Sequence, residues 1–492
     1  MNGAERLMLV LDAGTTSTRA MAFAPDGALR AVVQREITQH YPQPGRVEHN
    51  PEEIWQAALA CAREVVSQGG GADRFAGIGI TNQRETVVAW DRAKGQPLAR
   101  ALVWQDRRTA DTCEGLRAAG HEPEVQRRTG LLLDPYFSAT KMCWLIDNSG
   151  EVAAAAQAGT LALGTVESWL VFRLTGGAHI SDASNASRTS LLALDGAQFD
   201  EGLCELFGVP RGALPEVVDC AGDFGATLPE LFGAPIPILG LAGDQQAATI
   251  GQGCNAFGQV KATYGTGAFV LANMGGDLPA SHHRLLGTVL SQLDGRRTYA
   301  LEGSVFVAGS LIQWLRDSLG VIATAAETAA LAASVPDSGG VVLVPALSGL
   351  GAPHWRPEAR GALTGISFST TRAHLARAAL EAMSSQTRDL MEAFAADGVP
   401  WAMLRIDGGM SANDWMAQDL ADILDLPVER PAFVETTALG AAMLAGLGSG
   451  WFASLEEAAA AMRGKIHRFE PAMDAPTRDV RLGRWRDALA KV

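Results

Sequence analysis

The sequence predicts an α/β fold made of two lobes with a ligand cleft between them. Short apolar runs typical of strands alternate with helical patterns along the chain, which indicates sheets covered by helices. The 492 residues are too many for a single hydrophobic core. A strand, a Gly/Thr turn and a second strand open the chain, and this pattern returns weakly after residue 255. We therefore expect two related lobes, at residues 1–250 and 251–492, that bind ligands between them.

The first lobe is expected to open as a strand meander with glycine-containing turns. Apolar or alternating patterns predict a helix at residues 51–68 and strands at residues 7–11, 18–23, 29–37, 75–80 and 87–91. The polar residues 81–86 are expected to form a loop at a strand end. Residues 236–242 form an apolar run that predicts a buried strand.

The second lobe is expected to mix strands and alanine-rich helices. Strands are predicted at residues 260–264, 268–273 and 403–406. The Ala-rich stretches at 323–335 and 455–463 predict helices, because alanine is the best helix former. The chain is expected to end in a surface extension with a terminal helix.

The composition argues against nucleic acid and membrane partners. Lys and Arg number 40 and Asp and Glu number 54, a formal charge of −14, whereas nucleic-acid-binding proteins usually carry a basic face. The chain has no leader pattern and no apolar run of about 18 residues, so we expect a cytoplasmic protein without stable membrane insertion. The histidines lack metal-ligand spacing, and the adjacent His282 and His283 are expected at the surface.

Asp244 is the leading catalytic candidate. It follows the apolar run at 236–242 and lies between Gly243 and Gln245. A carboxylate at the end of a buried strand, beside glycine, is where α/β proteins place catalytic groups. We expect Asp244 to activate a hydroxyl group.

Residues 12–19 combine a carboxylate, a glycine turn, hydroxyls and a cation. A tight turn can aim N–H groups and hydroxyls at one anion. Asp12 could hold Mg²⁺ directly or through water, and Arg19 could neutralise a transferring phosphoryl group. With Asp244, the segment predicts phosphoryl transfer. The alternative is an ordinary polar hairpin turn, and the segment is not a Walker A loop.

Two further segments could bind a polyol. Arg84 and Glu85 offer a donor and an acceptor to hydroxyl groups, although an exposed ion pair on a surface turn is the alternative. Tyr136 could bond a ligand with its hydroxyl while its ring forms a wall, or could be a core residue. Trp104 and Phe269 are further candidates for an apolar wall.

Two glycine-rich turns in the second lobe could hold a nucleotide. Gly265-Thr266-Gly267 can place an amide and a hydroxyl against phosphate. The paired Gly408-Gly409 after a predicted strand lets a base or ribose lie against the backbone. The alternative there is a helix entry capped by Ser411 or Asn413.

The order of these motifs is more specific than any one of them. Asp-x-Gly-Thr-Thr-Ser, Thr-Asn-Gln-Arg-Glu-Thr, Asp-Pro-Tyr-Phe-Ser, Gly-Asp-Gln-Gln-Ala-Ala, Tyr-Gly-Thr-Gly and Asp-Gly-Gly follow one another along the chain. In this the chain resembles the FGGY carbohydrate kinase family, over residues 8 to 450. The resemblance implies two actin-like, ribonuclease-H-like lobes and transfer of the ATP γ-phosphoryl group to glycerol, with Mg²⁺ bound.

The resemblance also implies roles for individual residues. Glycerol would contact Arg84, Glu85, Tyr136, Asp244 and Gln245, with Trp104 and Phe269 along its carbon side. The phosphates would meet Thr15, Thr16, Ser17 and Arg19. The nucleotide would be held by Thr266, Gly309, Gln313, Gly409 and Asn413. The metal would be held by Asp12 and Asp244, and Asp244 would also act as general base.

The chain departs from the family pattern in a few places. Ala13, Glu167 and His354 replace a usual Gln, Asp and aromatic residue. Residues 227–237 lack the Gly-rich, Arg-bearing loop with which some relatives bind an inhibitory sugar bisphosphate, and so predict little inhibition by fructose 1,6-bisphosphate. Relatives form dimers and tetramers, which predicts a homo-oligomer. A kinase for another polyol or sugar, or a non-catalytic actin-like ATPase scaffold, are the alternatives.

Overall fold

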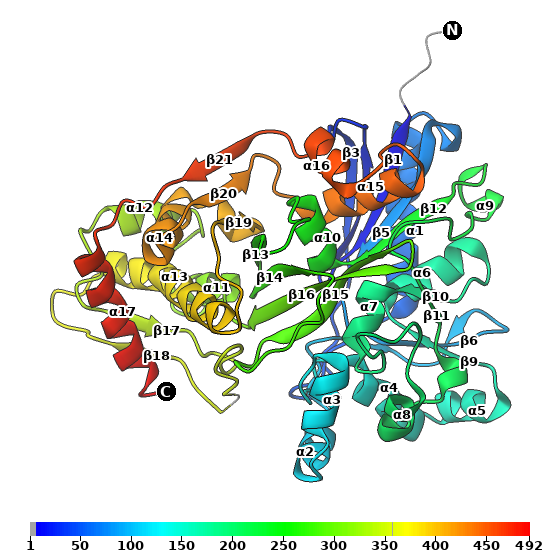
Figure 1. Ribbon diagram of the computed structural model, residues 1–492, viewed down its shortest axis with the longest axis horizontal. Coiled ribbons are helices and arrows are strands. Elements are labelled where there is room, and N and C mark those ends of the chain that lie inside the picture. The colour runs from blue at the N-terminus through cyan, green and yellow to red at the C-terminus, as the bar shows by residue number, and fades with distance from the viewer. Residues whose placement is uncertain (1–5, 357) are drawn as a thin grey trace, which may run out of the picture.

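The protein is described by a computed structural model that covers residues 6–356 and 358–492. In Figure 1, one large sheet lies at the upper right and a second runs from the centre to the upper left, each with helices around it. Blue to green elements from the first half of the chain lie on the right, and yellow to red elements lie mainly on the left. The predicted α/β class is confirmed.

The first sheet has five strands in the order β12-β5-β1-β2-β3. Strand β1 pairs antiparallel with β2 and parallel with β5, and β5 pairs parallel with β12. Its bounds are β1 (Leu7–Ala13), β2 (Ser17–Phe23), β3 (Leu29–Glu36), β5 (Phe75–Asn82) and β12 (Ile238–Gly243). Strands β1, β5 and β12 therefore deliver Asp12, Gln83 and Asp244 to one edge of the sheet, because their carboxyl ends point the same way.

The second sheet has seven strands in the order β15-β16-β14-β13-β19-β20-β21. Its bounds are β13 (Val260–Tyr264), β14 (Ala268–Gly275), β15 (Leu286–Leu293), β16 (Arg296–Val305), β19 (Leu404–Asp407), β20 (Val428–Pro431) and β21 (Ile466–Phe469). Strand β13 pairs antiparallel with β14 and parallel with β19, as β1 does with β2 and β5. The strand–turn–strand pattern predicted to repeat in the second half of the chain is thus present in both sheets, with the same pairing of its first strand.

Helices and short strands surround the sheets. The helices are α1 (Pro51–Gln68), α2 (Ala110–Ala118), α3 (Glu122–Thr129), α4 (Ser138–Asn148), α5 (Gly150–Ala158), α6 (Val166–Thr175), α7 (Ala183–Ala186), α8 (Glu201–Phe207), α9 (Pro229–Phe232), α10 (Asp244–Gly251), α11 (Gly309–Asp317), α12 (Glu327–Ala333), α13 (Arg372–Ala396), α14 (Asp414–Leu424), α15 (Thr436–Gly448), α16 (Leu455–Met462) and α17 (Ala475–Leu489). The short strands are β4 (Glu48–His49), β6 (Val88–Asp91), β7 (Gln96–Pro97), β8 (Ala101–Leu102), β9 (Leu161–Gly164), β10 (Ile180–Asp182), β11 (Glu216–Val218), β17 (Val342–Val344) and β18 (Ala362–Thr364).

Helix α1 shows how local sequence sets the elements. The Asn50 side chain accepts a hydrogen bond from the Glu52 N–H, and Pro51 occupies the first turn, where a missing N–H costs nothing. Ile54, Trp55 and other apolar residues at helical spacing are buried against the first sheet. The helix predicted at residues 51–68 is confirmed at both ends.

Helix α15 comes late in the chain but packs on the first sheet and on α10. Figure 1 shows α15, in orange, beside the blue strands. The two helices can approach closely because Gly440 has no side chain. A Cβ at this position would lie 1.8 Å from the Ala247 carbonyl oxygen. The lobe boundary near residue 250 stays a prediction, and sequence position alone does not assign α15 to a sheet.

Some element ends differ from the predictions. Strand β5 continues to Asn82, because Thr81 and Asn82 still pair with β1 and β12, so the loop expected from residue 81 begins only at Gln83. The Ala-rich stretch at 323–335 is helical only at α12. The terminal helix is confirmed. However, Trp485 is buried in the hydrophobic core around the second sheet, so α17 is more than a surface extension.

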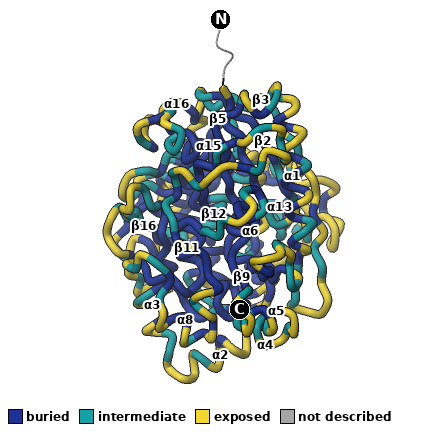
Figure 2. Tube along the Cα trace, turned by 90° about the vertical axis from the view of Figure 1, so that its right-hand side faces the viewer, coloured by how far each residue is buried: buried dark blue, intermediate teal, exposed yellow. Residues whose placement is uncertain are grey.

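Figure 2 shows buried segments through the middle of the molecule and exposed ones at its periphery. His282 and His283 are exposed, as predicted. Within residues 6–356 and 358–492, no helix is both long and apolar enough to cross a membrane.

Candidate active site

A small cavity of about 170 Å³ lies between the two sheets, around Asp244. Loop and helix residues from the first half of the chain line it together with residues of β13, β14 and the turn between them: Thr15, Arg84, Glu85, Trp104, Tyr136, Asp244, Gln245, Thr263, Gly265, Thr266, Gly267 and Phe269. All seven residues predicted to surround glycerol are therefore brought together. We call this space the acceptor cavity.

Asp244 opens helix α10 directly after β12 and faces the acceptor cavity. Its Oδ1 atom lies 3.3 Å from the Arg84 Nε and accepts a hydrogen bond of 2.7 Å from the Gln245 N–H. A third of its side-chain surface stays open, which leaves room for a ligand. Burial raises the pKa of Asp244 to about 6, with Arg84 opposing and Glu85 adding to the rise. A carboxylate with such a pKa is ionised at neutral pH and can accept a proton.

The segment at residues 81–86 is buried throughout, so its alternative interpretation as an exposed surface turn is wrong. Arg84 donates to both carboxylate oxygens of Glu302, at 2.6 and 3.2 Å, and to the Tyr136 hydroxyl at 3.3 Å. Glu85 has a φ of 61°, a left-handed conformation that non-glycine residues seldom adopt. The backbone thus turns sharply where the two side chains enter the site.

Three buried charged residues behind the cavity were missed by sequence reasoning. Glu302 lies on β16, and Arg188 donates to Glu302 at 3.0 Å and to Glu85 at 2.6 Å. Lys261 lies on β13 and donates to the Gln245 side-chain oxygen at 2.5 Å. A charge within an apolar strand was the available signal for Glu302 and Lys261, because such a charge must have partners in the core.

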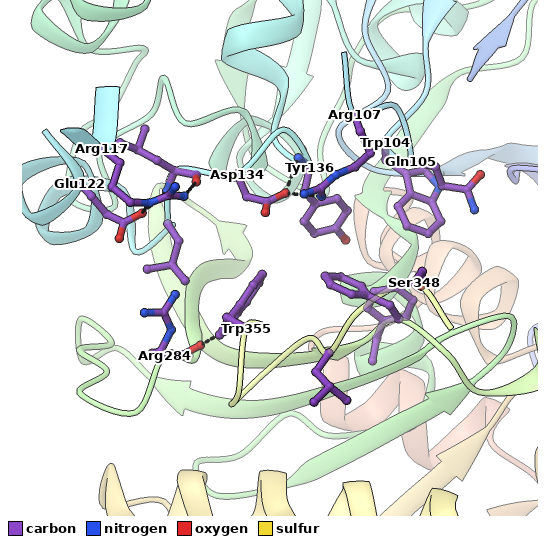
Figure 3. A pocket seen from close by; sticks show the side chains of 15 residues that line it. Trp104, Gln105, Arg107, Arg117, Glu122, Asp134, Tyr136, Arg284, Ser348 and Trp355 are labelled. Carbon is purple, nitrogen blue, oxygen red and sulfur yellow. Dashed lines mark hydrogen bonds and ion pairs between the residues drawn. The ribbon is translucent and has the colours of Figure 1, made fainter. Parts of the chain in front are cut away.

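Three aromatic rings close one side of the acceptor cavity. The Trp104 ring lies 5.7 Å from Tyr136 and 6.3 Å from Phe269, edge to face in both pairs. The Trp104 Nε1 donates to the Thr15 hydroxyl at 3.0 Å, which ties the wall to the turn at residues 12–19. The same rings line a neighbouring cavity of about 540 Å³ (Figure 3), so they separate a small space from a larger one.

In the turn at residues 12–19, the guanidinium of Arg19 is engaged in ion pairs. Arg19 binds the Asp12 carboxylate and, through NH1, the Glu435 carboxylate at 2.5 Å. Thr15 lines the acceptor cavity, whereas Thr16 and Ser17 line neither it nor the two larger cavities of the cleft. The Ser17 hydroxyl instead accepts from Gln34 on the neighbouring strand.

A cavity of about 620 Å³ adjoins the acceptor cavity at Gly265 and Thr266. Thr266, Gly309, Gln313, Gly409 and Asn413 all line it, so the five predicted nucleotide residues are brought together. The Asn413 side chain also caps α14 through the Met416 N–H, which is the alternative role considered for this turn. Because the two cavities share Gly265 and Thr266, the cavity of about 620 Å³ lies next to the one around Asp244. We call the larger of these two cavities the nucleotide cavity.

The three departures lie outside these cavities. Ala13 is buried in β1. Glu167 is buried and accepts from Asn82, Thr165 and Ser181, and burial, with Asp182, raises the pKa of Glu167 to about 7. His354 lies 3.1 Å from the Asp389 carboxylate.

Asp12 and Asp244 are the residues predicted from the sequence to hold a metal. Within the described residues, no group of three His, Cys, Asp or Glu side chains could hold an ion by itself. The strands that carry the two carboxylates are separated by β5, a spacing of about 10 Å. Either carboxylate alone would suit Mg²⁺, which keeps several waters and binds one or two carboxylates together with phosphate oxygens, although Asp12 is paired with Arg19 in this structure.

Comparisons with known proteins agree with this geometry. The N-terminal and C-terminal domains of the FGGY family of carbohydrate kinases match residues 7–251 and 260–449. A glycerol kinase of Rhodospirillum centenum is 54% identical over 99% of this chain and 98% of its own length, and one of Methylobacterium nodulans is 54% identical over 98% and 97%. The crystal structure of Plasmodium falciparum glycerol kinase with ADP is 34% identical, with a TM-score of 0.92 over 99% of this chain and 98% of that one. This chain belongs to the FGGY family of carbohydrate kinases.

Proposed function

We propose that this chain transfers the γ-phosphoryl group of ATP to glycerol, forming sn-glycerol 3-phosphate and ADP. The observation that carries the proposal is the small acceptor cavity around Asp244, which joins a nucleotide-sized cavity at Gly265 and Thr266. Relatives named glycerol kinase, 52–54% identical over nearly the whole chain, support the same acceptor.

Asp244 acts as the general base in this proposal. A terminal hydroxyl of glycerol lies against its carboxylate, which accepts the proton as the oxygen attacks the γ-phosphorus in line. The O–P bond to glycerol forms while the bond to the β-phosphate bridging oxygen breaks, and ADP leaves. Arg84 lies beside Asp244 and opposes the rise in its pKa, so the base is ionised at neutral pH.

Positioning and charge neutralisation supply most of the remaining catalysis. Thr15 and the backbone of the Gly265–Gly267 turn line the space where the phosphoryl group would pass. Mg²⁺, when bound near Asp12, would neutralise charge on the phosphates. Arg19 is held between Asp12 and Glu435 and would meet the γ-phosphate only after leaving one of these partners.

The size of the acceptor cavity favours a three-carbon polyol. Its volume of about 170 Å³ is well below the roughly 300–1,000 Å³ of pockets for drug-sized ligands. Another polyol or sugar is the second candidate, favoured by the larger cavity behind the aromatic wall. A non-catalytic ATPase scaffold would not need the buried polar groups at Arg84, Glu85 and Tyr136.

The test is ADP release with Mg²⁺-ATP and glycerol, dihydroxyacetone, erythritol, xylulose or no acceptor. Turnover selective for glycerol is expected. Turnover with a larger polyol in place of glycerol would contradict the assignment of glycerol as the substrate. ADP release independent of any acceptor would contradict the kinase proposal. Cytoplasmic location, a homo-oligomer and weak inhibition by fructose 1,6-bisphosphate stay predictions from the sequence.

A further inference from the structure

Lys261 is a buried cation to which the mechanism above gives no role. It is fully buried on β13, in a strand that is otherwise largely apolar. Its ammonium donates to the Gln245 side-chain oxygen at 2.5 Å and to the Thr263 hydroxyl at 2.8 Å. Both partners line the acceptor cavity, so Lys261 lies directly behind its wall.

The ammonium decides which way the Gln245 amide points. An amide group has an accepting oxygen and a donating NH₂, and an ammonium can only donate. The oxygen of Gln245 must therefore face Lys261, and the NH₂ must face away from it. The first turn of α10 fixes the backbone from which this side chain extends, and the Gln245 backbone carbonyl accepts a hydrogen bond from the Thr249 hydroxyl. Within the described chain, no residue accepts a hydrogen bond from the Gln245 side-chain nitrogen.

Lys261 keeps its charge at neutral pH. Burial lowers the pKa of Lys261 to about 8, and the nearby Asp407, Asp244 and Glu302 oppose this fall while Arg84 adds to it. A protonated amine also suits the short contact of 2.5 Å to the amide oxygen, because charge-assisted hydrogen bonds are the shorter ones.

The charged side chains that the structure places around the acceptor cavity do not offer a free hydrogen-bond donor to a ligand hydroxyl. Asp244 and Glu85 are carboxylates, which accept hydrogen bonds from hydroxyl groups. The guanidinium of Arg84 is occupied by Glu302, Tyr136 and Asp244. A hydroxyl oxygen that gives its proton to a carboxylate still has lone pairs, and the free NH₂ of Gln245 can donate to one of them.

We propose that Lys261 is a positioning residue for acceptor recognition, which fixes the Gln245 amide so that its NH₂ donates to a hydroxyl oxygen of the polyol. The proposal rests on the proposed function, because it requires a polyol in this cavity. It makes Lys261 and Gln245 one unit, so that either substitution removes the same hydrogen bond.

Calorimetric titration with glycerol tests the proposal without turnover. Lys261→Met removes the charge with little change in shape, and we expect the Kd for glycerol to rise about 5- to 100-fold, as for one lost hydrogen bond in a buried site. Gln245→Met is expected to give a similar rise, and the double variant no further rise. The KM for ATP should stay unchanged. Lys94→Met, on an exposed lysine, is the control.

Additive losses in the double variant, or an unchanged Kd in Lys261→Met, would overturn the proposal. If Lys261→Met does not fold, Gln245→Glu tests the hydrogen bond on which the role of Lys261 depends, because its carboxylate can pair with Lys261 but offers only oxygens to the acceptor. An unchanged Kd for glycerol in folded Gln245→Glu would also overturn it. Failure of the proposed function is distinguishable, because the unsubstituted protein would then neither bind nor phosphorylate glycerol.

Discussion

Glu302 and Arg84 form a buried bidentate ion pair that joins the second sheet to the acceptor cavity, with N–O distances of 2.6 and 3.2 Å. Arg188 also donates to Glu302, so one carboxylate serves two buried guanidinium groups. Paired in this way, Arg84 is held with its Nε towards Asp244. The pair therefore links the packing of the two sheets to the geometry of the candidate base.

Glu302→Gln should destabilise the fold and weaken acceptor binding. It leaves two buried guanidinium groups without their carboxylate, which typically costs about 3–5 kcal/mol. Urea unfolding and the KM for glycerol measure the two effects. Glu470→Gln, which removes an exposed ion pair with Arg468, should change stability by less than about 1 kcal/mol. Equal effects of the two substitutions would contradict this role of Glu302.

The stabilisation by Glu302 should depend on pH. Arg188 and Arg84 outweigh burial and lower the pKa of Glu302 from 4.5 to about 2. A carboxylate with a lowered pKa stabilises the fold above its unfolded pKa, and this stabilisation is lost as the pH falls from 4.5 towards 2. The difference in unfolding free energy between the unsubstituted protein and Glu302→Gln should therefore shrink over that range. A free-energy difference that stays constant between pH 4.5 and 2 would count against the lowered pKa of Glu302.

The activity should fall on the acid side of neutrality. Asp244 must be ionised to accept a proton, and its pKa is raised to about 6. We expect kcat/KM for glycerol to decline below about pH 6, since this parameter reports groups of the free enzyme. Lys261 lowers the pKa of Asp244, so Lys261→Met should move the decline to higher pH. A flat profile between pH 5 and 8 would contradict the assignment.

The aromatic wall should set acceptor size. Phe269→Ala removes one ring between the acceptor cavity and the cavity of about 540 Å³. Lost apolar contact should lower kcat/KM for glycerol about tenfold or more, while turnover with erythritol rises relative to glycerol. Steady-state assays with both acceptors measure this ratio. Phe257→Ala, on an exposed ring, should leave the ratio unchanged.

Gly440→Ala should destabilise the contact between α10 and α15. The new Cβ would lie 1.8 Å from the Ala247 carbonyl oxygen, so one helix must move, and overpacking typically costs about 1–3 kcal/mol. Thermal unfolding measures the loss. Gly483→Ala is the matched control, because a Cβ in that helix meets open space and should stabilise the protein by about 0.5–1 kcal/mol. Unfolding of Gly440→Ala at an unchanged temperature would contradict the close packing.

Local pattern predicted much of the fold. The helical spacing of residues 51–68 predicted α1 with its observed ends, and the apolar run before Asp244 predicted β12, because these patterns are local in sequence. The return of α15 to the first sheet could not be predicted this way. It depends on the fit of Gly440 to a helix distant in sequence, and a glycine in a helical pattern does not say what it meets.

The candidate site divides in the same manner. Asp244, Arg84 and Tyr136 stand in short polar motifs between apolar runs, so their residue types pointed to chemistry. Arg188 and Lys261 were missed because each pairs across the predicted lobe boundary near residue 250, Arg188 with Glu302 and Lys261 with Gln245. The partners in such pairs depend on tertiary packing; a charge within an apolar strand signals that Lys261 needs a partner but does not identify it.

The most direct test of the account is the turnover number of Asp244→Asn with glycerol and Mg²⁺-ATP, measured beside the binding of both ligands. Loss of the base should lower kcat about 10²- to 10⁴-fold. Binding of ATP should stay close to normal, because Asp244 does not line the nucleotide cavity. Turnover near that of the unsubstituted protein would contradict the role of Asp244 as the general base.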